Sequence, residues 1–103
     1  MLPKIHFVEN MDHIRRLDKE ANLWESRWWA VSPETAEKLV GGRIFFHKAQ
    51  KKPSFFGGDI TGFRVETGDE WRGRIIFKFK ASEECRGITT GPEGWGREKK
   101  IVL

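Results

Sequence analysis

The sequence contains no tyrosine, a single cysteine and no long apolar segment. Because Cys85 is alone, no disulfide can form within the chain, and packing must stabilise the fold. No apolar run approaches the ~18–20 residues that a membrane span requires, and residues 1–9 lack the apolar stretch of a signal peptide. These absences predict a cytoplasmic protein that does not associate with membranes.

Spacings typical of metal sites and phosphate-binding loops are also missing. The histidines and Cys85 do not form a Cys-x-x-Cys or His-x-x-x-His pattern, so no metal site is expected. Residues 91–96 are rich in glycine but lack the Gly-Lys-Ser/Thr ending of a phosphate-binding loop. Cys85 and His47 could form a nucleophile pair, but nothing near them in the sequence points to activation, and a lone cysteine usually packs as a small apolar residue.

One weak catalytic pattern remains. Glu98-Lys99-Lys100 formally fits the Glu-x-Lys element of some metal-dependent nucleases, with Asp59 or Asp69 as the partner acid. Such a short pattern arises by chance in many basic chains. We therefore expect a protein that is not an enzyme and that needs no cofactor.

Charge and large aromatic rings are abundant. The 103 residues carry a net charge of +4 and include 5 Trp and 8 Phe. A basic balance favours polyanionic partners, because lysines and arginines that contact phosphates release condensed counterions. Five tryptophans exceed what a small core usually holds, so some rings should lie at a surface or line a pocket. The length corresponds to one domain over residues 1–103.

Two segments show helical patterns. In residues 11–24, apolar side chains recur every three or four positions, which predicts an amphipathic helix. Ser32-Pro33-Glu34 predicts a helix start, with a hydroxyl cap, proline at the first helical position and an acid in the first turn. Gly41-Gly42 should end this second helix, because glycine adopts the left-handed C-terminal conformation without steric cost.

The remaining regular segments have strand patterns. The strand over 59–66 should carry a bulge at Gly62, which interrupts its alternation, and the strand over 43–48 should be buried on both faces. Residues 49–58 and 82–96 are expected to be loops. The predicted strands are 4–9, 27–31, 43–48, 59–66, 72–81 and a last one within 97–103.

These elements predict an α+β fold. Consecutive strands favour an antiparallel meander that curls into a small, mostly antiparallel, partly closed β-barrel with two helices. The chain carries Trp28 in a strand, then a short helix, Gly41-Gly42, a further strand, a basic loop, and the pattern apolar-x-Gly-apolar-x-apolar over 60–65. In this order the segments resemble the PUA-like superfamily, especially its EVE and ASCH branches, over roughly residues 26–81. The resemblance implies a small barrel with a cleft that binds RNA or a modified DNA base between aromatic walls.

Candidate binding residues combine flat rings with positive charge. The loop from Lys48 to Gly58 interleaves lysines with phenylalanines beside glycines, as single-stranded or flipped-base binding requires. Trp28 and Trp29 are adjacent in a strand, so their rings should point to opposite faces and one could stack on a base. We expect phosphate contacts from Lys48, Lys51, Lys52 and Arg64, stacking from Trp28, Trp29, Phe55, Phe56 and Trp95, and polar reading of the base edge by His47 and Ser54.

Each feature also has an ordinary structural explanation. Trp28 and Trp29 could both pack inside, and the phenylalanine pair could turn back into the core. The charged side chains of 72–81 fit the solvent face of any half-exposed sheet. Trp95, set among glycines, could belong to a lid over a ligand or could anchor its loop to the body.

The sequence therefore predicts a non-catalytic nucleic-acid-binding module that recognises RNA or a modified base in an aromatic, basic cleft. The alternative is a small protein-interaction module or inhibitor, of the phage or mobile-element type, that uses the same aromatic surface. Tryptophan and arginine are frequent hot spots of protein interfaces, so the composition also fits this alternative.

Overall fold

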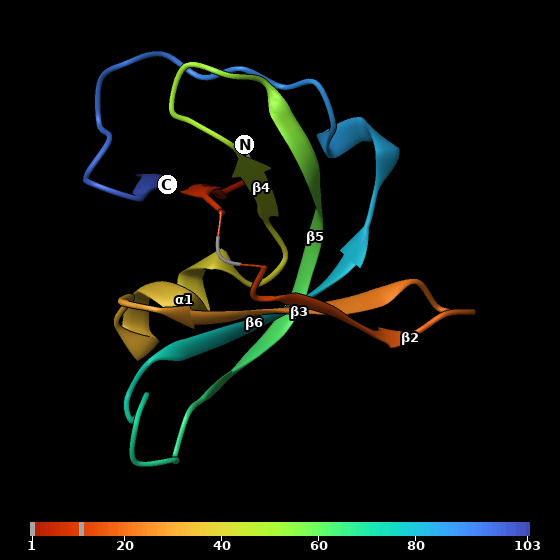
Figure 1. Ribbon diagram of the computed structural model, residues 1–103, viewed down its shortest axis with the longest axis vertical. Helices are drawn as coiled ribbons and strands as arrows, with labels where there is room; N and C mark the ends of the chain where they lie inside the picture. The colour runs from red at the N-terminus through yellow and green to blue at the C-terminus, as the bar shows by residue number, and fades with distance from the viewer. Residues whose placement is uncertain (1, 11) are drawn as a thin grey trace.

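A single mixed β-sheet forms the framework of the molecule (Figure 1). The computed structural model describes residues 2–10 and 12–103. Within these residues, seven strands are hydrogen-bonded in the order β2-β3-β6-β5-β4-β1-β7, and only the pair β1–β4 is parallel. The elements in chain order are β1 (Lys4–Val8), β2 (Ile14–Asp18), β3 (Leu23–Trp29), α1 (Pro33–Leu39), β4 (Arg43–His47), β5 (Ser54–Val65), β6 (Ile75–Ala81), the 3-10 helix η1 (Glu83–Cys85) and β7 (Lys99–Val102).

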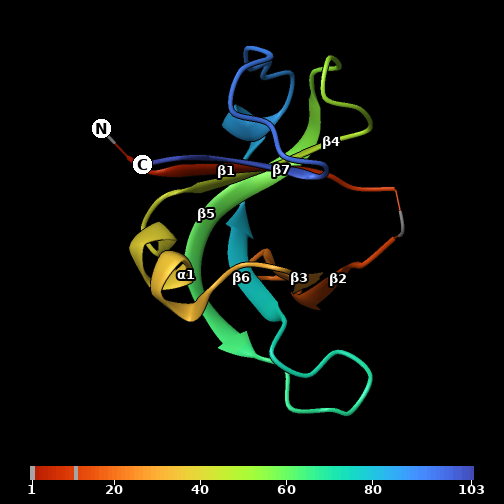
Figure 2. The same cartoon turned by 90° about the vertical axis from the view of Figure 1, so that its left-hand side faces the viewer.

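The sheet is strongly curved because β5 is long and bends. Figure 2 shows β5 passing from the level of β1, β4 and β7 to the level of β3 and β6, with α1 beside it. The register of β5 against β6 shifts between Ile60 and Gly62, so the predicted bulge is confirmed. The outermost strands β2 and β7 do not pair with each other in the described chain, and the sheet therefore remains open.

One face of the curved sheet and helix α1 enclose the core. Phe7 and Phe46 from one part of the sheet and Phe77 from the other are fully buried there. Burial of each such side chain contributes roughly 1.5–3 kcal/mol relative to exposure. The predicted burial of β4 on both faces is confirmed, because Phe45 is 3% exposed and its neighbours Ile44 and Phe46 are 0% exposed.

Helix α1 begins and ends where the sequence predicts. The Ser32 hydroxyl accepts a hydrogen bond from the backbone N–H of Thr35 at 3.2 Å, and Pro33 occupies the first turn. Ala36 and Leu39 are fully buried, and the helix packs on β5 and β6. The helix ends at the extended Val40, and Gly41 takes φ +89° in the turn that follows, which the N–H of Gly42 closes on the carbonyl of Leu39 at 2.9 Å.

The helix predicted over residues 11–24 is wrong for the part of that segment that the structure describes; Met11 lies outside it. Residues 14–18 and 23–24 instead belong to β2 and β3, which form an antiparallel hairpin. Its turn is built by Asp18, whose side-chain oxygen accepts from the N–H of Ala21 at 3.1 Å, and by Asn22 at φ +56°. Aspartate and asparagine favour such turns because they hydrogen-bond locally and tolerate left-handed backbone.

Tertiary pairing explains why the helical spacing was misleading. Ile14 and Trp24 pack against the core, as a helix would also require, but Leu17 is 41% exposed. β2 covers one edge of β3 with backbone hydrogen bonds. Pairing and packing of this kind override local propensity in sheets.

The predicted loop over 49–58 is wrong in its second half, because β5 already begins at Ser54. Gly57 and Gly58 do not form a turn but let neighbouring strands approach. A Cβ atom on Gly57 would overlap the carbonyl oxygen of Ile44, and one on Gly58 would overlap that of Lys80. The glycine pair thus allows close contact of β5 with β4 on one side and β6 on the other.

The fold is therefore mostly β, with one α-helix among the described residues. The antiparallel meander β4-β5-β6 and the last strand are confirmed, whereas the expected second helix is replaced by the β2–β3 hairpin. The sheet is not closed into a barrel. No described helix is long and apolar enough to cross a membrane.

Candidate functional site

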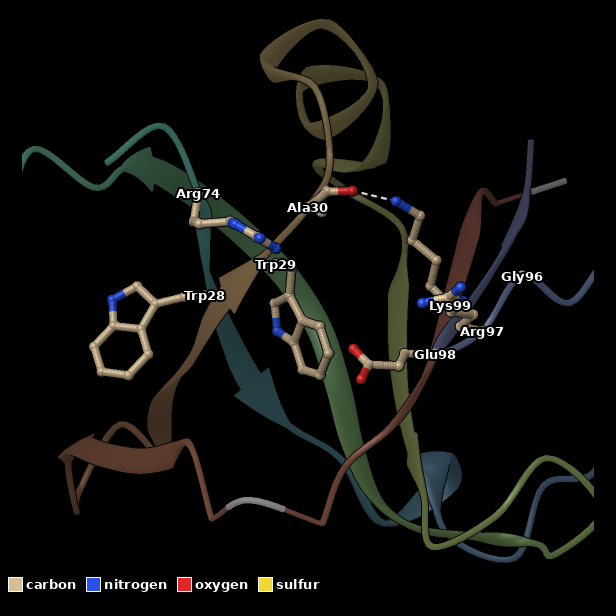
Figure 3. Close-up of a pocket in the computed structure, with 8 residues that line it drawn as sticks. All are labelled: Trp28, Trp29, Ala30, Arg74, Gly96, Arg97, Glu98 and Lys99. Carbon is tan, nitrogen blue, oxygen red and sulfur yellow. Dashed lines mark hydrogen bonds between the residues drawn. The ribbon is translucent and has the colours of Figure 1, made fainter. Parts of the chain in front are cut away.

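A groove lies between the end of β3 and the start of β7. Two adjoining cavities, of about 380 Å³ and 320 Å³, share Trp28, Trp29, Arg74 and Glu98 in their linings. These volumes fall within the range of small-ligand pockets, roughly 300–1,000 Å³. We call the two cavities together the β3–β7 groove; Figure 3 shows one of them. The groove exists because the curved sheet brings β3 and β7 toward each other without pairing them.

Trp29 forms a fixed aromatic surface in the groove. Its ring stacks on Phe7 with centroids 3.7 Å apart and planes inclined by 15°. The indole N–H donates to the hydroxyl of Ser26 at 2.8 Å. Trp29 is only 7% exposed, yet it lines both cavities. The part of the ring that faces the groove is therefore held rigidly by the core behind it.

Trp28 and Trp71 form an aromatic wall beside this surface. Their rings are 5.0 Å apart and 4° from parallel, and the ring of His13 meets Trp28 edge-on at 5.1 Å. The guanidinium of Arg27 lies 4.5 Å from the Trp28 ring centre. The Trp28 indole N–H donates to Glu66 at 2.9 Å, and this hydrogen bond lowers the pKa of the Glu66 carboxyl.

Three charged side chains of the groove have no partner among the described residues. Arg74, Arg97 and Glu98 form neither an ion pair nor a side-chain hydrogen bond there. Figure 3 shows the guanidinium of Arg74 and the carboxylate of Glu98 directed toward Trp29 from different sides. By contrast, the Lys99 ammonium donates to the carbonyl of Ala30. The groove thus offers two cations and one carboxylate that are available to a ligand.

His47, predicted to read a base edge, lies away from the groove and is fully buried. Its Nδ1 is 2.8 Å from the carbonyl oxygen of Lys52, and its Nε2 is 2.9 Å from Nδ1 of His6. Because a carbonyl oxygen only accepts, Nδ1 of His47 carries the hydrogen, and His6 donates to Nε2 when both rings are neutral. His47 therefore ties the loop before β5 to β1.

Ser54 also has a structural position. It is 4% exposed, and its hydroxyl donates to the carbonyl of Cys85 at 2.5 Å and accepts from the N–H of Ile88 at 3.0 Å. The cysteine is itself buried, and burial raises the pKa of its thiol. These contacts connect the start of β5 to the chain after β6.

The three predicted stacking residues outside β3 are partly buried and lie in separate places. Phe56 packs edge-on against Trp24 at 4.9 Å, and Phe55 lies 4.4 Å beneath the ammonium of Lys48. Trp95 contacts the ring of His47 edge-on at 5.8 Å. Of the two alternatives for Trp95, this contact favours an anchor of its loop rather than a lid.

The predicted phosphate-binding residues differ in whether they are free to contact a ligand. Lys51 and Lys52 are exposed on the loop between β4 and β5. This loop adjoins the groove, because the Gln50 amide donates to the carbonyls of Gly96 and Arg97 at 3.1 and 3.2 Å. Arg64, by contrast, is paired with a carboxylate, that of Glu25, at 3.2 Å.

Of the predicted site, the structure thus brings only Trp28 and Trp29 into the β3–β7 groove. Sequence reasoning missed Trp71, Arg74, Arg97 and Glu98, which also line it. The sequence favours an ordinary interpretation of Arg74 as a charge on a sheet face, and it places Glu98 only in a nuclease pattern. No sequence spacing indicates that the turn before β6 and the segment before β7 meet beside β3.

Comparisons of the chain with protein-family models, with curated proteins and with solved structures find no match. No group of three or more histidine, cysteine, aspartate or glutamate side chains that could hold a metal ion occurs in the described chain. Fold and site together define a small, open-sheet β protein with an aromatic groove bordered mainly by cations.

Proposed function

We propose that this protein is a non-catalytic, PUA-like module that binds nucleic acid and takes one base into the β3–β7 groove. The observation that supports this best is the Trp29 ring, fixed by the core, with the unpaired charges of Arg74 and Glu98 directed toward it and Arg97 in the same lining. Trp28, half-buried and in the lining of both cavities, is more accessible than Trp29, and an aromatic ring that stacks on a base contributes about 1–3 kcal/mol, whatever the base. Such binding requires no cofactor and fits the cytoplasmic location that the sequence predicts.

The charge distribution suggests a path for the phosphate backbone. Arg97 lies at the groove, and Gln50 joins it to the loop that carries Lys51 and Lys52. A strand whose base enters the groove would find cations for its next phosphates along this loop. Phosphate contacts position a nucleic acid without reading its sequence, which suits exposed lysines on a loop.

Titrations of labelled single- and double-stranded RNA and DNA oligonucleotides test the proposal, with fluorescence anisotropy measured over a range of salt concentrations. We expect the logarithm of the association constant to fall linearly with the logarithm of salt concentration, by about 0.7 per phosphate contact for a single strand. Arg97→Glu should weaken binding about 10-fold or more and reduce this slope, because it removes one cation at the groove and adds an anion.

Lys19→Glu is the matched control. Lys19 is exposed in the β2–β3 turn and undergoes the same change of charge as Arg97 in the test variant. Its binding should stay within about two-fold of that of the unmodified protein, apart from the general effect of net charge. Absent or salt-independent binding would reject the proposal. Equal losses of affinity in Arg97→Glu and Lys19→Glu would show that the groove is not the binding site.

A further inference from the structure

We propose that the base recognised in the β3–β7 groove is guanine. This inference rests on the proposed function and deepens it. It is carried by the placement of one carboxylate and one guanidinium, those of Glu98 and Arg74, on different sides of the Trp29 ring (Figure 3). A base that enters the groove beside that ring would present one edge to an acceptor and another edge to a donor.

The carboxylate of Glu98 restricts which base edge can face it. An ionised carboxylate has only acceptors, and it is best satisfied by two parallel donors. Guanine offers two adjacent donors, N1–H and the N2 amino group, on its pairing edge. The pairing edges of adenine and cytosine place a ring-nitrogen acceptor beside a single amino group. Those of uracil and thymine place one N–H between two carbonyls. Only guanine can therefore donate a hydrogen bond to each oxygen of a carboxylate from its pairing edge.

Arg74 restricts the neighbouring edge of the base and also favours guanine. A guanidinium has only donors and binds paired acceptors through two parallel hydrogen bonds. Guanine carries the acceptors O6 and N7 side by side on the edge away from N2, and arginine bound to these atoms is the commonest specific base contact. Adenine presents an amino group next to N7 and would direct a donor at Arg74.

The groove holds these two groups ready for a ligand. Neither Arg74 nor Glu98 has an ion pair within the described chain, so no internal pair must be broken when a base enters. Lys99 is engaged with the carbonyl of Ala30 and does not compete for Glu98. Arg97 is then available to contact a phosphate of the bound strand. Trp29, immobilised by Phe7, borders the base on one side, and the half-buried Trp28 offers the ring on which the base stacks.

Short oligothymidylates with one variable central base provide the test. The dissociation constants of oligonucleotides with central guanine, adenine, cytosine or thymine are measured at one fixed salt concentration. Guanine should bind about 10- to 100-fold more tightly than the other three, the discrimination expected of a good bidentate contact. Inosine, which lacks the N2 amino group, and 7-deazaguanine, which lacks N7, should each lose most of this preference.

Two variants test which side chain contacts which atom of the base. Glu98→Gln should abolish the difference between guanine and inosine, because an amide has one acceptor where the carboxylate has two. Arg74→Gln should abolish the difference between guanine and 7-deazaguanine. Glu20→Gln, at an exposed position of the β2–β3 turn, is the control for loss of one negative charge and should keep the preference.

The outcomes separate this inference from the proposed function. If no oligonucleotide binds in a salt-dependent manner, the proposed function fails and guanine recognition fails with it. If oligonucleotides bind but the four bases do not differ, or another base is preferred, only the guanine inference is overturned. It is also overturned if a guanine preference survives unchanged in Glu98→Gln.

Discussion

Trp28 and Trp71 stack with ring centroids 5.0 Å apart and planes 4° from parallel, although they belong to β3 and to the connection between β5 and β6. The Trp28 indole also donates to Glu66 at the end of β5. Both contacts join the β5–β6 connection to β3. The wall of the β3–β7 groove is therefore arranged before a ligand arrives, which reduces the entropy lost on binding.

Trp71→Ala should destabilise the protein by about 1–2 kcal/mol, because Trp28 loses its stacking partner and part of its packing. Oligonucleotide binding should weaken several-fold as the wall becomes mobile. Urea unfolding followed by circular dichroism measures the first effect, and anisotropy measures the second. Trp71→Phe is the control, since it keeps an aromatic face and should lose less than half as much stability. Unchanged unfolding of Trp71→Ala would show that the stack contributes nothing.

Stability should fall between pH 6.5 and about 4 because of His6. Burial, followed by the charges of His47, Lys100 and Lys4, lowers the pKa of His6 from 6.5 to about 4. The unfolded chain takes up a proton on this ring near pH 6.5, whereas the folded protein does so only near pH 4, so acidification in this window favours unfolding. The loss reaches up to about 3 kcal/mol and is complete once both states are protonated.

Chemical denaturation across this pH range, with His6→Gln as the comparison, measures the effect. The glutamine amide can still donate to His47 but does not titrate, so the variant should show a flatter dependence of unfolding free energy on pH. The same steep dependence in both proteins would assign the acid sensitivity to another group.

Glu25 should be more important for stability than its number of contacts suggests. Its side chain is 8% exposed and lies within 3.2 Å of Arg64 and 3.1 Å of Arg15. Burial acts to raise the pKa of Glu25, but hydrogen bonds and charge from Arg64 and then Arg15 lower it below its usual value. Glu25→Gln should cost about 1–3 kcal/mol, because the charges of two arginines lose their partner.

The exposed pair of Asp69 with Arg72 is the control for this change. Asp69→Asn should alter stability by less than about 1 kcal/mol, as is usual for surface pairs. Thermal unfolding of both variants at neutral pH compares them. Equal effects would contradict the structural role of Glu25. The ionised Glu25 stabilises the fold above its ordinary pKa, so this contribution should be lost when the pH falls below its lowered value.

Gly57→Ala should destabilise the protein by about 2–3 kcal/mol. A Cβ atom there would overlap the Ile44 carbonyl and lie 2.9 Å from Cβ of Cys85, so β4 and β5 would have to separate. Gly62→Ala is the matched control, because no heavy atom of the described chain lies within 4 Å of its Cβ position. Urea denaturation should place the control within about 0.5 kcal/mol of the unmodified protein. Similar midpoints for both variants would contradict the close approach.

Local sequence signals predicted the elements whose sequence is compatible with only one kind of secondary structure. The Ser32-Pro33 start of α1, the strands β1, β4, β6 and the bulge near Gly62 follow from capping chemistry and alternation, which act within a few residues. The helix prediction for residues 11–24 failed because their apolar spacing fits both a helix and a half-exposed hairpin. The hairpin forms because β2 pairs with the edge of β3 that β6 leaves free.

The binding site was less accessible to sequence reasoning. Trp28 and Trp29 are predicted from the sequence as stacking residues because they are adjacent rings, and both line the groove. His47 and Ser54 are equally suitable by residue type, but both are buried away from the groove, and Phe56 lies outside the groove against Trp24. Residue type indicates what a side chain can bind, whereas the tertiary structure decides which cavity, if any, the side chain lines.

The sequence by itself determined the class of the molecule: a small basic chain with excess tryptophan, a capped short helix and alternating strands, all set by composition and by contacts along the chain. Only the tertiary structure decided that Arg74, Trp29 and Glu98 share a groove, because these residues come from three segments distant in the chain. The curvature of β5 brings those segments together, and curvature arises from the packing and pairing of the whole sheet rather than from any local pattern.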